Sequence, residues 1–403
     1  DNVDRRDRDQ QLRVFQVAQW FKSESRAFFF LTLRDTTFEM YKSEPPLDAF
    51  VKTANFYIHP PRFTDVVRKR LRLTLDYLVK ETGDQQRYTL PNGMEVTYPG
   101  TALGAYLTKI YINLFNQKRQ IAGVLEALSG RDVRKALSMF ADIIVSKHLP
   151  ESTITQSIIT RENALINEQH VIRVLMRTVY RLFDDDHGYV TNILCVPGED
   201  TEADNFLYVE ILEFLIERRK QVGDVGMEGY YFVGTVEKEM ERLGYPKQDT
   251  RSVLQHAYNR NLIVTEYQGS RSLEVDDQIA VHGSGFIHSR FLLRRLEYVA
   301  AALPVTSVED KSVAQRISSY WNIPPHKNDV SMASKIAVAE LFLDYIKIRF
   351  DSKKKKNPYF GEFSRAAPHM IKSIEKEIEF GKRPQLKGRR QPALFDRARD
   401  RRS

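Results

Sequence analysis

The first sixty residues contain one helical pattern followed by one strongly apolar strand. Apolar residues recur at roughly helical spacing between Leu12 and Phe21, which predicts a helix. Seven uncharged residues, Ala27–Leu33, follow between two arginines. Such a run is typical of a strand buried on both faces, as in a parallel sheet covered by helices. A single strand cannot form a sheet, so we expect its neighbours to come from residues before Asp1.

Residues 63–150 carry a mostly helical pattern. The stretch just before it, 56–62, is expected to form a strand that ends at Pro60 and Pro61, because proline cannot continue a strand ladder. Within the helical stretch, a loop rich in glycine and proline is expected at 92–100.

The connecting region beyond residue 150 is expected to contain one helix, from Arg173 to Phe183. A turn is expected at 184–188, where three aspartates adjoin a histidine. Adjacent aspartates in a loop are typical of a solvated turn, so we do not expect a metal there.

Residues 204–296 alternate between helical and strand patterns in the order of a winged helix. A glycine-rich loop separates the first helix from a short strand at 230–232. We expect the helices to pack around Leu212, Leu215, Met240 and Leu254. Helices are expected at 205–219, 235–243 and 248–259, an antiparallel hairpin from 262–266 and 272–275, and a further helix at 286–302.

The carboxyl-terminal region is expected to be helical from 305 to 380. One apolar stripe, typical of a core-facing helix, consists of Val338, Leu341, Phe342, Tyr345 and Ile348. Four lysines followed by Asn-Pro are expected to end that helix, and a last helix is expected near 370–380.

Composition and charge narrow the class of protein. With 403 residues, 42% hydrophobic and 28% charged, the chain is typical of two or three globular domains. The net charge is +8, but residues 381–403 alone carry nine basic and two acidic groups, so residues 1–380 together are nearly neutral. This basic tail could contact nucleic acid or another polyanion. Cys195 is the only cysteine, and no long apolar segment or signal peptide is visible, which favours a cytoplasmic protein without a membrane partner.

Two motifs in the first segment resemble a P-loop ATPase core of the AAA+ or STAND type. Asp1-Asn2-Val3-Asp4 resembles a Walker B end, and Thr32-Leu33-Arg34 is similar to the sensor-1 strand of STAND proteins. The resemblance implies that Asp1 binds Mg²⁺, that Asp4 activates the attacking water, and that Arg34 contacts the γ-phosphate of ATP. Without the resemblance, the same residues are a charged helix cap and an arginine that meets solvent.

Two further matches lie in the helical and winged-helix regions. The sequence Ser129-Gly-Arg-Asp-Val-Arg-Lys-Ala-Leu137 resembles the sensor-2 helix of AAA+ lids, which implies that Arg134 projects toward the nucleotide. His282 lies near the position where STAND winged helices present a histidine to the ADP phosphates. The alternatives are a surface arginine in a helical bundle and a histidine satisfied by backbone.

No Gly-x-x-x-x-Gly-Lys-[Ser/Thr] motif occurs in the chain. The chain alone therefore lacks the loop that cradles phosphates. From the start at Asp1, we expect the chain to be the second half of such an ATPase.

The resulting expectation is a mainly α chain with some β, comprising a partial α/β P-loop NTPase core, a helical lid, a winged helix and a C-terminal helical segment. The resemblance implies ATP and Mg²⁺ as cofactors, self-association into a ring or higher oligomer, an effector protein, and service in bacterial antiviral defence. The alternative is a non-catalytic winged-helix protein that binds DNA in replication initiation or transcription. The expected boundaries are 1–62 for the core, 63–200 for the lid and linker, 201–303 for the winged helix, 304–380 for the helical region and 381–403 for the tail.

Overall fold

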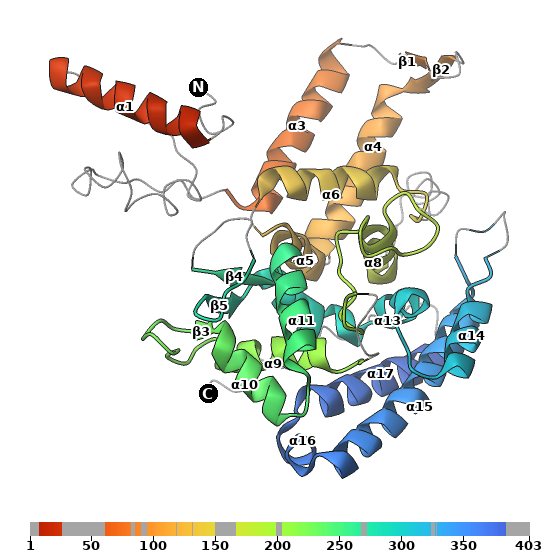
Figure 1. The fold of residues 1–403 in the computed structure, drawn as a ribbon. Coiled ribbons are helices and arrows are strands. Elements are labelled where there is room, and N and C mark those ends of the chain that lie inside the picture. Colours follow the sequence, from red (N-terminus) through yellow and green to blue (C-terminus); the bar gives the residue numbers. More distant parts are fainter. Residues whose placement is uncertain are drawn as a thin grey trace, which may run out of the picture.

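The chain is mainly helical, with a few short strands (Figure 1). The computed structural model describes residues 8–25, 61–81, 85–89, 95–117, 119–130, 132–149, 167–198, 204–266, 272–323, 327 and 329–383. Helix α1 (Arg8–Glu24) confirms the first predicted helix. The strands predicted at 27–33 and 56–62 lie outside the described residues, apart from residues 61 and 62.

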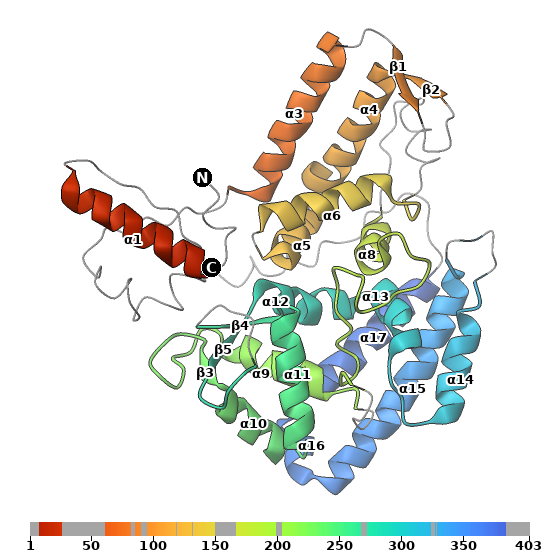
Figure 2. The same ribbon diagram turned by 45° about the horizontal axis from the view of Figure 1, so that its top comes forward.

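A helical region follows, and its helices enclose an apolar core that includes Val67, Leu125 and Met139. The α3–α4 pair projects away from the rest and carries a two-stranded hairpin at its tip (Figures 1 and 2). The predicted loop at 92–100 is therefore wrong in part, because the β-prone residues at 96–98 lie in a strand that pairs with the strand before it. The elements are α3 (Phe63–Glu81), β1 (Gln85–Thr89), β2 (Glu95–Pro99), α4 (Gly100–Tyr111), the π-helical turn η3 (Ile112–Gln117), α5 (Arg119–Ser129) and α6 (Val133–Val145).

Helix α8 (Glu168–Arg177) begins earlier and ends earlier than predicted. Thr178 adopts a positive φ of 51°, which stops the helix before Phe183, its predicted last residue. In the segment that follows α8, side chains accept hydrogen bonds from the backbone and fix its course. Asn192 accepts from the backbone N–H of Leu194 at 3.0 Å, and the hydroxyl of Tyr298 accepts from Ile193 N at 3.0 Å.

Three helices and a small sheet form the next region. Leu212, Leu215, Met240 and Leu254 are all buried, as predicted. The sheet has the order β3–β5–β4, and both pairs are antiparallel. The elements are α9 (Leu207–Arg218), β3 (Tyr231–Phe232), α10 (Val233–Arg242), α11 (Lys247–Asn259), β4 (Ile263–Thr265) and β5 (Gln278–Val281).

Two predictions in this region are wrong. The strand that pairs with β4 is β5, in the register Ile263 to Val281, whereas 272–275 forms no strand. The helix predicted at 286–302 is broken near Phe291 and Arg295, both of which have non-helical backbone angles. Three shorter elements replace it, namely α12 (Gly283–Arg290), the 3₁₀ turn η4 (Leu292–Arg294) and α13 (Leu296–Ala302).

The carboxyl-terminal helices form a layer around the long helix α15, which packs against both α14 and α17. Four members of the predicted apolar stripe are buried, but Ile348 is 70% exposed. Asn357 ends α15 directly after the lysine run, as predicted. The elements are η5 (Leu303–Val305), α14 (Lys311–Tyr320), α15 (Met332–Lys356), α16 (Pro358–Phe363) and α17 (Ala366–Lys382).

A buried ionic cluster joins α8, α13 and α15. Glu297 accepts two hydrogen bonds from the Arg173 guanidinium, at 2.8 and 3.1 Å, and one from Lys335 Nζ at 2.5 Å. Asp329 pairs with Lys335, with Arg173 at 2.9 Å and with Arg177 at 3.0 Å. Burial opposes ionisation of Glu297, yet Arg173, Lys335 and Arg177 together lower its pKa to about 2. The cluster therefore holds three cations and two carboxylates.

Candidate functional site

Three of the predicted site residues, Asp1, Asp4 and Arg34, lie outside the described residues. The other two, Arg134 and His282, lie at a junction between the helical region and the region of three helices and a small sheet. Here α5 packs against α12 (Figure 2).

The turn between α5 and α6 supplies the first side of this junction. Gly130 closes α5 with a φ of +62°, a conformation that glycine adopts without steric cost. Asp132 is the N-cap of α6 and accepts from the backbone N–H groups of Arg134 at 2.8 Å and Lys135 at 3.1 Å. Arg134 is exposed on the first turn of α6, so its guanidinium is accessible to a ligand.

His282 supplies the second side. Its Nδ1 lies 2.8 Å from the carbonyl oxygen of Asn261, so Nδ1 carries the proton and donates it to that oxygen. The opposite edge of the ring lies against Gly130, where a Cβ would come within 2.9 Å of His282 Cε1 and 3.3 Å of Nε2. Residues far apart in the sequence thus meet at this point, and the contact leaves no room for a side chain on residue 130.

Gly130→Ala is expected to lower the free energy of unfolding by roughly 1–3 kcal/mol, because alanine at this φ is strained and its Cβ overlaps His282. Urea denaturation at neutral pH measures the change. Gly123→Ala is the matched control, since Gly123 lies in the middle of α5 and a Cβ there meets nothing within 4 Å. That control should be neutral or more stable by about 0.5–1 kcal/mol. Equal losses in both variants would contradict the packing.

Two further titratable side chains lie near this junction, Lys135 on α6 and His288 on α12. Burial lowers the pKa of the Lys135 ammonium; nearby Asp132 opposes the shift, and nearby Arg260 adds to it. His288, fully buried on α12, accepts from Thr191 N at Nε2 and lies 2.7 Å from Ser284 O through Nδ1. Burial lowers the pKa of His288 to about 4, so this histidine is neutral at pH 7.

The sequence predicts a solvated turn at 184–188, but two of its aspartates are paired within the chain. Asp186 pairs with Arg260 at 2.7 Å. Asp185 accepts from Asn192 N at 2.6 Å and lies 3.3 Å from His256 Nε2, whose ring contacts the Tyr208 hydroxyl through Nδ1 at 3.0 Å. These aspartates hold α11 in place. In the described ranges, no group of histidine, cysteine, aspartate and glutamate side chains is arranged to hold a metal ion.

The basic residues on α11 and directly after it are paired within the chain, although this is the helix that would read DNA. Arg251 pairs with Glu237 at 2.6 Å and donates to Leu273 O at 2.7 Å. Lys247 also lies near Glu237, at 3.7 Å, and Arg260 is held by the aspartate turn. A helix that reads base edges needs such side chains free.

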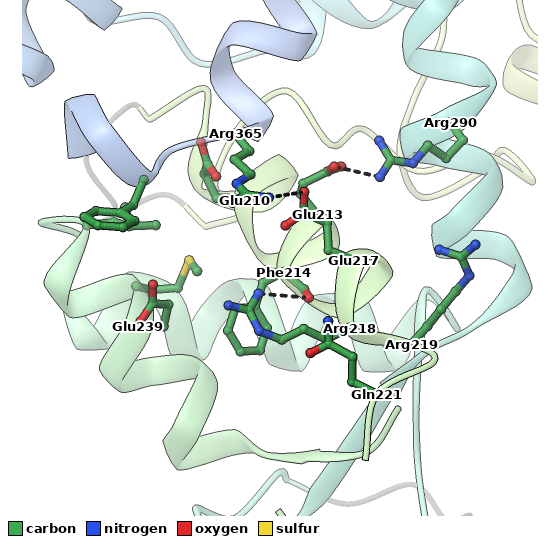
Figure 3. A pocket seen from close by; sticks show the side chains of 13 residues that line it. Glu210, Glu213, Phe214, Glu217, Arg218, Arg219, Gln221, Glu239, Arg290 and Arg365 are labelled. Atoms are coloured by element: carbon green, nitrogen blue, oxygen red, sulfur yellow. Dashed lines mark hydrogen bonds and ion pairs between the residues drawn. The ribbon is translucent and has the colours of Figure 1, made fainter. Parts of the chain in front are cut away.

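A second feature is a charged cavity of about 540 Å³ between α9, α10 and the loop before α17 (Figure 3). Glu213 pairs with Arg290 at 2.6 Å, and Glu217 with Arg365 at 3.4 Å. Glu210, one turn before Glu213, accepts from the Ser364 hydroxyl and from Ala367 N at 3.0 Å. Burial raises the pKa of Glu210 to about 7, against these hydrogen bonds.

Glu210 is expected to make stability depend on pH. Its pKa in the folded chain is raised from 4.5 to about 7, so its contribution to the unfolding free energy is complete below pH about 4.5 and is lost as pH rises through 7. The whole change amounts to roughly 3 kcal/mol. Glu210→Gln stays neutral and should remove this part of the pH profile, which urea unfolding between pH 5 and 8 would measure. Glu217→Gln is the control and should keep the profile of the unmodified chain.

No protein family, curated protein or solved structure matches this chain. Among the described helices, none is both long and apolar enough to cross a membrane. Because no relative is available for comparison, the support for the candidate site is the geometry of the described residues.

Proposed function

We propose that this chain is part of an ATP-dependent oligomeric switch or motor ATPase of the STAND or AAA+ type. The observation that carries the proposal is the contact of His282 with Gly130, the glycine that precedes the predicted sensor-2 helix. The two segments that resemble nucleotide contacts are 152 residues apart in the sequence, from Gly130 to His282, and adjoin one another in space.

The junction suits part of a nucleotide site. Arg134 offers an exposed guanidinium, which binds phosphate oxygens well. His282 already donates from Nδ1 to Asn261 O, so it would donate to a phosphate through Nε2 only when its ring is protonated. The described residues supply neither a phosphate-binding loop nor a metal ligand set, so the proposal requires a phosphate-binding loop outside these 403 residues. In the proposal, Asp1 would hold Mg²⁺, which would neutralise phosphate charge, Asp4 would polarise water, and Arg34 and Arg134 would contact the γ-phosphate.

We further propose that α9, α10, α11 and the β3–β5–β4 sheet form a winged helix that contacts protein rather than DNA. Three observations support this role: the pairing of Arg251 with Glu237, the pairing of Arg260 with Asp186, and the packing of α12 against α5. Ring or higher assembly, an effector protein and a role in antiviral defence belong to the same proposal.

The test is nucleotide binding by the natural full-length protein, measured by calorimetry with ATP and ADP in the presence of Mg²⁺. The proposal expects binding, and it expects weaker binding in His282→Ala. The rival function, a DNA-binding protein without catalysis, expects no nucleotide binding and an affinity for duplex DNA that falls steeply with salt. Absence of nucleotide binding together with such a salt dependence would overturn the proposal.

A further inference from the structure

An acidic groove runs along α15 between α14 and α17. It has a volume of about 1000 Å³. Its floor includes Leu341, Tyr345 and Ile348 from one face of α15. Ile348 is the exposed member of the α15 stripe, so the floor presents an uncovered apolar side chain.

The charge of the groove is negative. Three basic side chains line it, Arg316, Arg349 and Lys382, against six carboxylates. Asp344 and Glu379 are exposed, and neither has an ion pair among the described residues. The six carboxylates are those of Glu309, Asp310, Glu340, Asp344, Glu375 and Glu379.

We propose that the basic tail, residues 384–403, binds in this acidic groove of its own chain. The tail carries seven basic and two acidic residues and includes one apolar pair, Leu394-Phe395. A basic segment with an apolar anchor complements an acidic groove with an apolar floor. The proposal does not depend on nucleotide binding.

The starting point and length of the tail fit this occupant. Helix α17 ends at Lys382, which lines the groove and pairs there with Glu340. The tail therefore leaves from the rim of the groove. From Ala337 to Ile348 the floor rises about 17 Å along α15, at about 1.5 Å per residue. Five or six extended residues cover that distance, at about 3.3 Å each, so the tail is long enough. Docking within the chain also has the advantage of a high effective concentration.

The experiment is photo-crosslinking in the full-length chain, with p-benzoylphenylalanine in place of Phe395 and the products mapped by mass spectrometry. Crosslinks are expected on the groove faces of α15 and α17, and their yield should fall at least fivefold in 1 M salt. The double variant Asp344→Lys and Glu379→Lys should lower the yield at least as much. The control pair Glu241→Lys and Glu362→Lys changes exposed carboxylates away from the groove and should leave the yield unchanged.

The outcomes separate the possible occupants of the groove. A mixture of isotopically light and heavy chains should give crosslinks within one chain. Mixed light–heavy crosslinks would assign the groove to the tail of a second copy and overturn the proposal. Crosslinks outside the groove, or a yield that the groove variant does not change, would overturn it as well. Thermal melting of each variant verifies that the fold is intact.

Discussion

Replacing Glu297 by alanine is expected to lower the free energy of unfolding by about 3–5 kcal/mol. Glu297 is 1% exposed and is contacted by Arg173, Arg177 and Lys335. Its removal leaves three buried cations with Asp329 alone, and an uncompensated charge in an apolar surrounding is costly. Equilibrium unfolding in urea, followed by circular dichroism, measures the loss.

Two further variants test this explanation. Glu297→Ala combined with Lys335→Met removes one charge of each sign and should recover part of the loss, because the pair is then absent rather than broken. Arg68→Ala breaks an exposed pair with Asp65 and should change stability by no more than about 1 kcal/mol. A loss in Glu297→Ala no larger than in Arg68→Ala would show that the cluster is not what stabilises this region.

Changing Asp4 to Asn in the natural full-length protein is expected to slow ATP hydrolysis by ~10²–10⁴-fold while leaving ATP binding nearly intact. The reason is the division of roles in the proposal. In that proposal Asp1 would hold the metal ion, so its removal would weaken nucleotide binding as well, whereas Asp4 would only orient and polarise water. Steady-state turnover and nucleotide affinity, measured on the same preparations, separate the two effects.

Arg34→Ala and Arg134→Ala should instead uncouple hydrolysis from assembly, since both side chains are proposed to sense the γ-phosphate. Arg72→Ala, an exposed arginine on α3, is the matched control and should behave as the unmodified protein. If the proposed residues are only solvated surface charges, all of these variants will be silent. Unchanged turnover in Asp4→Asn would remove the main argument for an enzyme.

The hydrophobic pattern and the residues at helix ends are enough to predict most of the helices. The α9 segment has apolar residues on every side, and it is buried almost throughout, from Leu207 to Ile216. The turn before α6 was also readable, because Gly130 and Asp132 are residue types that end and begin helices. Such features depend only on residues a few positions away, so they can be predicted from the sequence alone.

Long-range pairing could not be read in the same way. The partner of β4 is decided by Ile279, which follows the strand that the pattern had favoured and is buried against both β3 and β4. The break between α12 and α13 occurs where Arg295 turns toward Glu168, 127 residues earlier in the chain. The run of aspartates at 184–186 is visible in the sequence, but nothing in the sequence indicates that Asp185 and Asp186 pair with His256 and Arg260.

The ionic cluster also bears on how the molecule comes apart. Glu297 on α13 pairs with Arg173 on α8 and with Lys335 on α15 only when all three helices are docked. A partly open form that released any one of these helices would leave an unpaired charge in the interior. Such a buried charge is unfavourable unless water enters to solvate it. The three helices therefore constitute one cooperative unit, which opens together or not at all and whose amide protons should share a single protection against exchange.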